Sequence, residues 1–143
     1  MSRRYMLDTN TVSYIVSGKS PAARAKLAGL LHNQIACISA ITEAELLYGL
    51  AKNPNALRRA AIEGFFARIQ VLPWGSDEAS AYGQLRAQQE ASGKTLGNLD
   101  MLIAAHAISV DAVLVTSDKV FAHVPSLASI VNWATDLPHS PER

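Results

Sequence analysis

The 143-residue chain contains a single cysteine, Cys37, so it cannot form an internal disulfide. It has no hydrophobic run near the ~18 residues that a membrane-spanning helix needs, and its first residues turn polar before a signal-peptide core could form. The formal net charge of +1 neither predicts nor excludes a nucleic-acid partner. We therefore expect a globular, cytoplasmic protein that has no contact with membranes.

The chain also lacks internal repeats, low-complexity tracts and Pro-, Gly- or Ser-rich linkers. Hydrophobic residues make up 49% of it, which suits one domain with a sizeable core. We predict a single domain over residues 1–136. Residues 137–143 contain two prolines and little to bury, and are expected to form a frayed tail.

Short apolar segments alternate with longer amphipathic ones, a pattern typical of parallel βαβ units. Strands are predicted at residues 4–8, 34–39, 69–74, 112–116 and 129–133. Helices are predicted at residues 9–16, 20–33, 41–52, 55–69, 76–93 and 98–110. The strands are apolar throughout, as expected when both faces of a sheet are covered. The fold class is therefore α/β, a three-layer α/β/α arrangement around a short-stranded, mainly parallel sheet.

Several helix ends carry recognisable residues. Ser20 followed by Pro21 predicts an N-cap with proline in the first helical position. Ser76 is the expected N-cap of the long helix that follows it, and Gly93 is suited to the left-handed position just past its end.

Four acidic residues, far apart in the sequence, are predicted to meet at one edge of the sheet. Asp8 ends the first strand, and Asp118 follows the fourth. Glu45 lies in the first turns of the helix after the second strand, and Asp100 opens the helix that leads into the fourth. In parallel sheets, binding sites form at the carboxyl ends of the strands. The four carboxylates therefore predict an acidic pocket.

A cation is the natural complement of such a pocket, because like charges held close raise one another's pKa and destabilise the fold. Oxygen ligands favour hard ions, so Mg²⁺ or Mn²⁺ is expected, and no Cys/His set has zinc spacing. Mg²⁺ is commonly completed by substrate phosphate, which points to phosphodiester or phosphoryl chemistry.

Each acid also has a structural interpretation. Asp8 and Asp118 could cap the helix or turn that follows them. Thr42 and Glu45 have the spacing of a capping box, and Asp100 could serve only the helix dipole.

Glu43 is an alternative to Glu45 on the same helix. The helical wheel places Glu45 on the face of Gly49, where a small residue leaves room for an ion or a substrate. Glu43 falls between Leu47 and Leu50, so Glu45 is favoured.

Histidine chemistry is not favoured. A metal-free ribonuclease needs two convergent histidines, and His32, His106, His123 and His139 show no such pairing. His106 is predicted to be a core histidine.

Basic residues that could bind a phosphate backbone are Arg3, Arg4, Arg86, Lys94 and Lys119, and the last three are the predicted substrate-binding residues. Lys94 and Lys119 are expected near the acidic edge, and Arg86 lies on the long helix that leads to it. Arg58 and Arg59 are interpreted as an ordinary solvated helix face.

Four motifs, "MLDTN", "ISAITEAELLYGL", "GNLDMLIAAHA" and "LVTSDKVFAHVPSL", resemble in order the acidic motifs of PIN-domain nucleases. They look most like those of the VapC toxins of toxin–antitoxin modules. The resemblance spans Tyr5 to Trp133.

This resemblance implies a Mg²⁺- or Mn²⁺-dependent endoribonuclease, usually a homodimer, that is neutralised by a cognate VapB-type antitoxin. Its site residues would be Asp8, Glu45, Asp100 and Asp118, of which Asp118 stands in a motif where many relatives carry asparagine. The segment around Arg86 is similar to that of VapC toxins described as cutting initiator tRNA.

An antitoxin is expected to lay apolar side chains over the helices at 11–16 and 61–69. Phe65 and Phe66 are adjacent, so one helix face can hardly bury both.

Three alternatives remain. A haloacid-dehalogenase-like phosphatase needs a second acid where Asn10 stands. A Mg²⁺-binding receiver domain needs an acceptor aspartate after the third strand, and that strand ends without one. A PIN-like domain that binds RNA without cutting it is the third.

Overall fold

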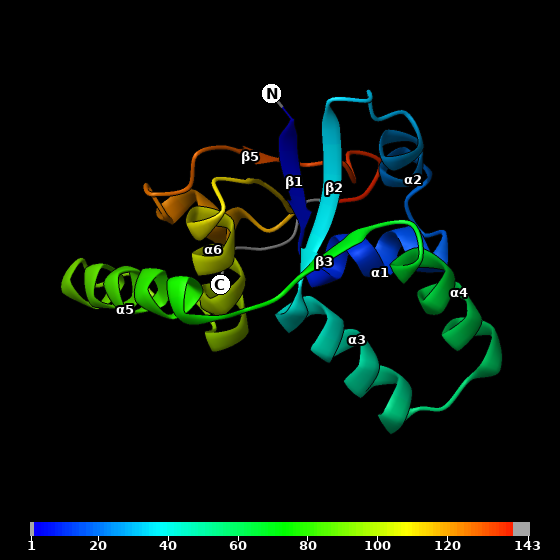
Figure 1. Cartoon of the computed structure of the whole chain (residues 1–143), viewed down its shortest axis with the longest axis horizontal. Helices are drawn as coiled ribbons and strands as arrows, with labels where there is room; N and C mark the ends of the chain where they lie inside the picture. The colour runs from blue at the N-terminus through cyan, green and yellow to red at the C-terminus, as the bar shows by residue number, and fades with distance from the viewer. Residues whose placement is uncertain (1, 139–143) are drawn as a thin grey trace.

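Five short parallel strands form one sheet in the computed structural model, which describes residues 2–138 (Figure 1). The strands are β1 (Arg3–Leu7), β2 (Gln34–Ser39), β3 (Gln70–Leu72), β4 (Val113–Val115) and β5 (Ile130–Val131). Their spatial order is β3-β2-β1-β4-β5, so the first strand of the chain lies at the centre of the sheet.

Helices cover both faces of this sheet. They are α1 (Thr9–Ser17), α2 (Pro21–Ala28), α3 (Ala40–Lys52), α4 (Ala56–Phe66), α5 (Ser76–Ala91) and α6 (Asn98–Ser109), with a 3₁₀ helix η1 (Lys119–His123). Figure 1 shows α5 and α6 on one side of the sheet and α1 to α4 on the other. The predicted three-layer α/β/α fold is therefore confirmed.

The strands build two separate hydrophobic cores, because successive side chains point to opposite faces of a sheet. One core contains Met6, Cys37 and Leu114 and packs against α5 and α6. The adjacent residues Leu7, Ile38 and Val115 belong to the other core, under α1, α3 and α4. The strands are apolar at successive positions because both of their faces are buried.

The observed helix ends agree in part with those predicted from the sequence. Ser20 caps α2, with Pro21 in its first turn, and Gly93 has a φ of 73° just past α5, as predicted. The N-cap of α5 is Gly75 and not Ser76, because the Glu78 side chain accepts a hydrogen bond from the Gly75 N–H. The helix predicted over 20–33 ends at Ala28, with Gly29 as its C-cap.

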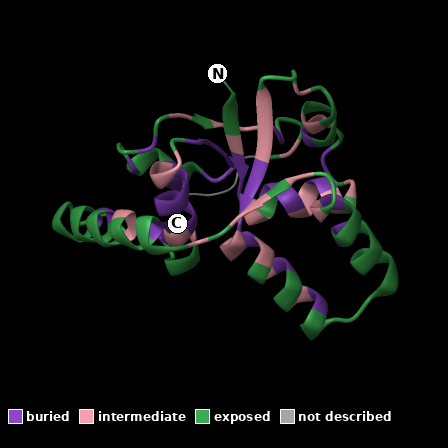
Figure 2. Cartoon of the chain, in the orientation of Figure 1, coloured by how far each residue is buried: buried purple, intermediate pink, exposed green. Residues whose placement is uncertain are grey.

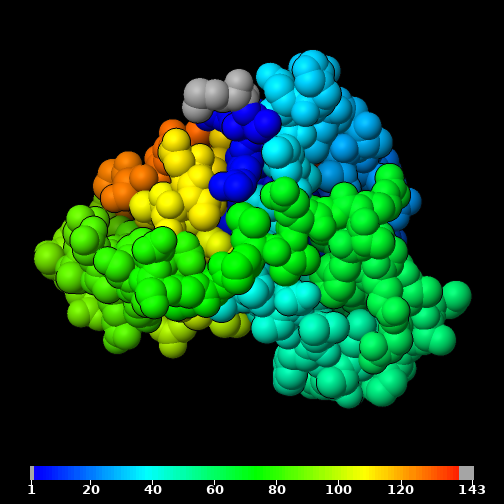
Figure 3. Space-filling view, in the orientation of Figure 1, coloured from blue at the N-terminus to red at the C-terminus, as the bar shows by residue number. Residues whose placement is uncertain are grey.

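The carboxyl ends of the central strands and the starts of α1, α3 and α6 share one edge of the molecule. In the space-filling view this edge is hollowed between the α5–α6 side and the α3–α4 side (Figure 3). The outer part of α5 and the α3–α4 hairpin is largely exposed around the hollow (Figure 2).

No helix within residues 2–138 is long and apolar enough to cross a membrane. Residues 139–143 of the tail predicted at 137–143, with His139 among them, lie outside the described residues.

Candidate functional site

A pocket of about 310 Å³ lies at the carboxyl edge of the sheet. It is lined by Asp8, Thr9, Asn10, Glu45, Gly97, Asn98, Leu99 and Asp100. Three of the four predicted acids thus meet in one cavity, although they come from the β1–α1 junction, α3 and α6.

Asp8 is buried and has two structural bonds. Its Oδ1 accepts a hydrogen bond from the Thr11 N–H at 2.9 Å, which caps α1, and its Oδ2 accepts one from the Thr116 hydroxyl at 2.5 Å. Burial raises the pKa of Asp8 above its usual value, and the Asp118 charge adds to this rise. Desolvation, and not mainly repulsion between neighbouring acids, is therefore what perturbs this carboxyl group.

Glu45 lies half-buried on α3, where its Oε1 accepts a hydrogen bond from the Thr9 hydroxyl at 2.6 Å. The capping-box interpretation of Glu45 is wrong. The N-cap of α3 is Ser39, whose hydroxyl oxygen accepts a hydrogen bond from the Ile41 N–H at 3.0 Å. Glu45 is thus free of a helix-capping role.

Asp100 and Asp118 are placed differently. Asp100 is half-buried in the first turn of α6, whose N-cap is Gly97, and it lines the pocket. Asp118 is buried, and its Oδ1 accepts a hydrogen bond from the Val120 N–H at 3.1 Å as the cap of η1. Asp118 acts electrostatically on Asp8 but does not line the pocket.

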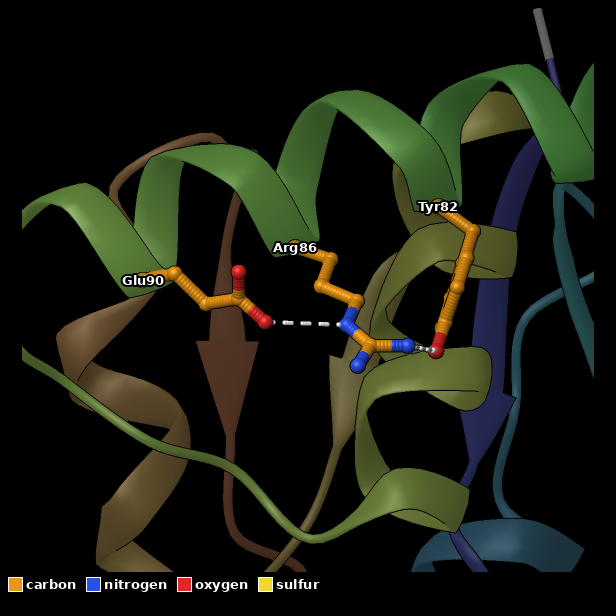
Figure 4. Close-up of polar contacts among 3 residues, drawn as sticks. All are labelled: Tyr82, Arg86 and Glu90. Carbon is orange, nitrogen blue, oxygen red and sulfur yellow. Dashed lines mark hydrogen bonds and ion pairs between the residues drawn. The ribbon is translucent and has the colours of Figure 1, made fainter.

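None of the three predicted basic residues lines the pocket. Arg86 lies on the exposed side of α5, where its guanidinium donates to the Glu90 carboxylate at 3.0 Å and to the Tyr82 hydroxyl at 3.2 Å (Figure 4). Lys94 and Lys119 are exposed, the first three residues before Gly97 and the second directly after Asp118. The three basic residues are therefore exposed and lie outside the lining of the pocket.

Polar residues that the sequence reasoning left out also belong to the site. Thr9, Asn10 and Asn98 line the pocket, and the Thr116 hydroxyl binds Asp8. All four adjoin an acid in the motifs "DTN", "GNLD" and "TSD", so proximity to the acids was the available signal.

His106 is fully buried, as predicted for a core histidine. Its Nδ1 shares a hydrogen bond of 2.7 Å with the Ser39 hydroxyl. Burial lowers the pKa of His106, while the Glu78 charge opposes the shift. A neutral, enclosed imidazole cannot serve the pocket as an acid or a base.

The lining suits a hard divalent cation. Carboxylate, hydroxyl and amide groups converge there, without a thiol or an imidazole. Within residues 2–138, no three Asp, Glu, His or Cys side chains already form a metal cage. An ion here would therefore have few direct protein ligands and would keep water in its shell, as Mg²⁺ commonly does.

The chain is similar over most of its length to proteins of one family. The PIN domain model matches residues 5–127. Ribonuclease VapC2 of Rickettsia felis is 35% identical over 131 residues, which cover 90% of this chain and 97% of that protein. The tRNA(fMet)-specific endonuclease VapC of Salmonella typhimurium is 36% identical over 132 residues, covering 91% and 98%.

Solved structures agree. The crystal structure of VapBC2 from Rickettsia felis, bound to a DNA fragment from their promoter, matches with a TM-score of 0.85 and 34% identity, covering 91% of this chain and 98% of that one. The DNA-bound VapBC of Salmonella typhimurium matches with a TM-score of 0.82 and 35% identity, covering 93% and 99%.

The sheet order also excludes the receiver alternative, because a receiver domain has the strand order 2-1-3-4-5, whereas β3 here is an edge strand. The phosphatase alternative fails at Asn10, which lies in the pocket where that chemistry needs a second acid. The chain belongs to the PIN-domain family and, within it, to the VapC ribonucleases.

Proposed function

We propose that this ribonuclease hydrolyses RNA phosphodiester bonds at the acidic pocket with the help of Mg²⁺ or Mn²⁺. The observation that carries the proposal is the meeting of Asp8, Glu45 and Asp100 in one cavity from three separate segments of the chain. Asp8 and Asp100 would hold the ion. Both oxygens of Asp8 accept one hydrogen bond each, and a carboxylate has about four acceptor positions, so capacity for a cation remains.

The ion would polarise the scissile phosphate and lower the pKa of an attacking water. Glu45, held by Thr9, would accept the proton of that water. In-line attack forms a bond between the water oxygen and phosphorus and breaks the bond to the 3′ oxygen, which takes up a proton. The products are a 5′-phosphate and a 3′-hydroxyl. Asp118 raises the pKa of Asp8 from outside the pocket, and its negative charge would add to the attraction of a cation.

Cleavage by the purified protein tests this proposal. RNA should be cut with Mg²⁺ or Mn²⁺, left intact with EDTA, and should carry 5′-phosphate ends. Cutting that persists in EDTA, or that leaves 2′,3′-cyclic phosphates, would contradict metal-assisted hydrolysis. Binding of RNA without cutting in any metal would favour the non-catalytic PIN-like alternative.

We propose tRNA as the substrate class and the cytoplasm as the site of action. The name of the Salmonella relative states specificity for tRNA(fMet), and the exposed Arg86, Lys94 and Lys119 could contact the backbone of a folded RNA beyond the pocket. Sequencing of RNA 5′ ends after brief induction in bacteria should show new ends concentrated in tRNA. New ends spread evenly over mRNA and rRNA would overturn the substrate assignment.

We propose that a VapB-type antitoxin inhibits the chain, since the solved relatives are VapBC complexes. A groove of about 390 Å³ lies between the helices predicted to receive it. Residues lining this groove include Ile15, Val16, Arg24, Leu27, Gly64, Phe65, Arg68 and Ile69. Phe65 is buried there while Phe66 is only half-buried, in line with the crowding expected of two adjacent phenylalanines.

Two glycines allow a matched test of the groove. A Cβ added at Gly64, in the groove, or at Gly83, on α5, meets no atom within 4 Å, so both helices tolerate a larger residue. Gly64→Leu should weaken co-purification with the antitoxin while RNA cleavage continues. Gly83→Leu should leave co-purification unchanged. Equal binding by both variants would exclude this groove as the antitoxin site.

A homodimer stays a prediction. Leu47, Tyr48 and Leu57 are exposed on the α3–α4 hairpin and supply an apolar surface for it. The mass of the purified chain in solution would test this.

A further inference from the structure

One buried hydrogen bond joins the two helices that carry Glu45 and Asp100. The His106 Nδ1 on α6 lies 2.7 Å from the Ser39 hydroxyl at the start of α3. Both side chains are fully buried, and the same hydroxyl oxygen caps α3 by accepting from the Ile41 N–H. The contact therefore fixes the first turn of α3 against the last turn of α6.

The opposite nitrogen of this ring, Nε2, is buried without a hydrogen-bond partner among the described residues. Glu78 of α5 attracts the ring electrostatically, but its carboxylate is hydrogen-bonded to the Gly75 N–H at 2.9 Å and the Ser109 hydroxyl at 2.6 Å. A buried polar atom without a partner destabilises a fold. Stability alone would favour an apolar residue at this position, as in the neighbouring Ala105 and Ala107.

Serine, histidine and glutamate in this order have the composition of a hydrolase triad. That function is excluded here because the Ser39 hydroxyl is fully buried and already serves as a helix cap. A substrate cannot reach it, so the hydrogen bond acts within the protein.

Each residue of this hydrogen bond is six positions away from one pocket carboxylate on its own helix. Asp100 precedes His106 by six residues on α6, and Glu45 follows Ser39 by six residues along α3. Six residues of helix correspond to about 9 Å. A shift of either helix at this contact would therefore change the separation of the two carboxylates across the pocket.

We propose that His106 is a positioning residue, whose bond to Ser39 holds α3 and α6 at the spacing that lets Glu45 and Asp100 act on one ion and one phosphate. This inference rests on the proposed metal-dependent function of the pocket. Misplacement of catalytic groups by about 1 Å can lower a rate ~100-fold. A small shift of α3 against α6 is therefore sufficient to slow RNA cleavage.

Three variants at this position separate positioning from stability. His106→Leu removes the bond and also the unpartnered nitrogen. His106→Asn retains a polar atom where Nδ1 lies, attached to the same Cγ atom. His106→Gln places its amide one carbon farther out and serves as the matched polar control.

Two readouts are needed, RNA cleavage kinetics and the rise in melting temperature caused by Mn²⁺ without RNA. His106→Leu removes the unpartnered Nε2 but also leaves the buried Ser39 hydroxyl without its partner on α6, so it should melt in EDTA close to wild type. It should lose most of the Mn²⁺-dependent rise and show a kcat ~10–100-fold lower, with KM within about 2-fold. His106→Asn should restore kcat and the Mn²⁺ response to near wild type, and His106→Gln should not.

Retention of kcat and of the Mn²⁺ response by His106→Leu would overturn the proposal. If His106→Leu fails to fold, equal activity of the Asn and Gln variants would overturn it, and higher activity of the Asn variant would support it. If wild type does not cut RNA but its Mn²⁺ response depends on His106 in this pattern, the proposed function fails while the positioning role stands.

Discussion

Two pairs of carboxylates lie at the carboxyl edge of the sheet, and the structure holds them in different ways. Asp8 and Asp118 follow strands β1 and β4, are 5% and 4% exposed, and each caps the helix that follows it. Glu45 and Asp100 lie inside α3 and α6, are half-buried, and neither is an N-cap.

The first pair therefore contributes to the fold as well as to the site. A buried carboxylate is unfavourable unless hydrogen bonds compensate it, and the bonds that Asp8 accepts from Thr11 and Thr116 do this. Glu45 and Asp100 need less compensation because solvent reaches them. Substitutions in the first pair should change stability and activity together, whereas substitutions in the second pair should change mainly activity.

The largest effect is expected at Glu45. Glu45→Gln keeps the shape of the side chain but removes its charge and basicity, so kcat for RNA cleavage should fall ~100-fold or more. Glu43→Gln, two residues away on the same helix, is the matched control and should remain close to wild type. If Glu43→Gln were the more damaging change in initial-rate measurements, the pocket-facing side of α3 would be wrongly assigned.

A stability effect is expected at Asp8 in metal-free protein. Asn caps a helix about as well as Asp and carries no buried charge, so Asp8→Asn should match or exceed the unfolding free energy of wild type in EDTA. Asp8→Ala lacks the cap and should be less stable than Asp8→Asn by ~1 kcal/mol. Urea unfolding gives both values, and an equal loss in the two variants would show that the charge itself stabilises the fold.

A pH effect is expected at His106, which is buried outside both pairs. Burial holds its pKa below the ordinary value near 6.5 despite the Glu78 charge. Below about pH 6.5 the unfolded chain therefore binds a proton that the folded chain does not. The free energy of unfolding should fall as the pH drops through this value, by at most ~1.4 kcal/mol per pH unit.

Urea unfolding from about pH 7.5 to about pH 5.5 measures this slope. His106→Asn has no titrating ring and should lose less stability than wild type over the same range. Identical slopes would place the origin of the pH dependence in other groups.

The smallest effect is expected at Arg86, whose ion pair with Glu90 is exposed. Arg86→Ala should leave stability unchanged, weaken RNA binding several-fold, and reduce the salt dependence by about one phosphate contact. Arg59→Ala on α4 is the control. Salt titrations of RNA affinity that do not distinguish the two variants would remove Arg86 from the RNA-binding surface.

The layers of the fold were predictable because alternating strands and helices leave few topologies open. Helix ends were less predictable, since a side chain from inside a helix can replace the expected cap. Glu78 does so at Gly75, and Ser39 makes the capping box suggested for Glu45 unnecessary.

The meeting of Asp8, Glu45 and Asp100 was predictable from the expected positions of strand ends and helix starts, with the helical wheel selecting Glu45 over Glu43. The separation of Asp118 from the pocket was not, because it depends on the turn that makes Asp118 the cap of η1. The bond between His106 and Ser39 was equally inaccessible, since it joins residues 67 positions apart and depends on how α6 packs against α3.

Calorimetric titration of Mn²⁺ into the metal-free protein tests the shared pocket most directly. Wild type and Glu43→Gln should bind Mn²⁺ with the same affinity, whereas Asp8→Asn and Asp100→Asn should each bind at least ~10-fold more weakly, because each removes one negative ligand from a pocket with few others. Equal affinity in all four proteins would contradict the account, because the carboxylates would then not form one metal site.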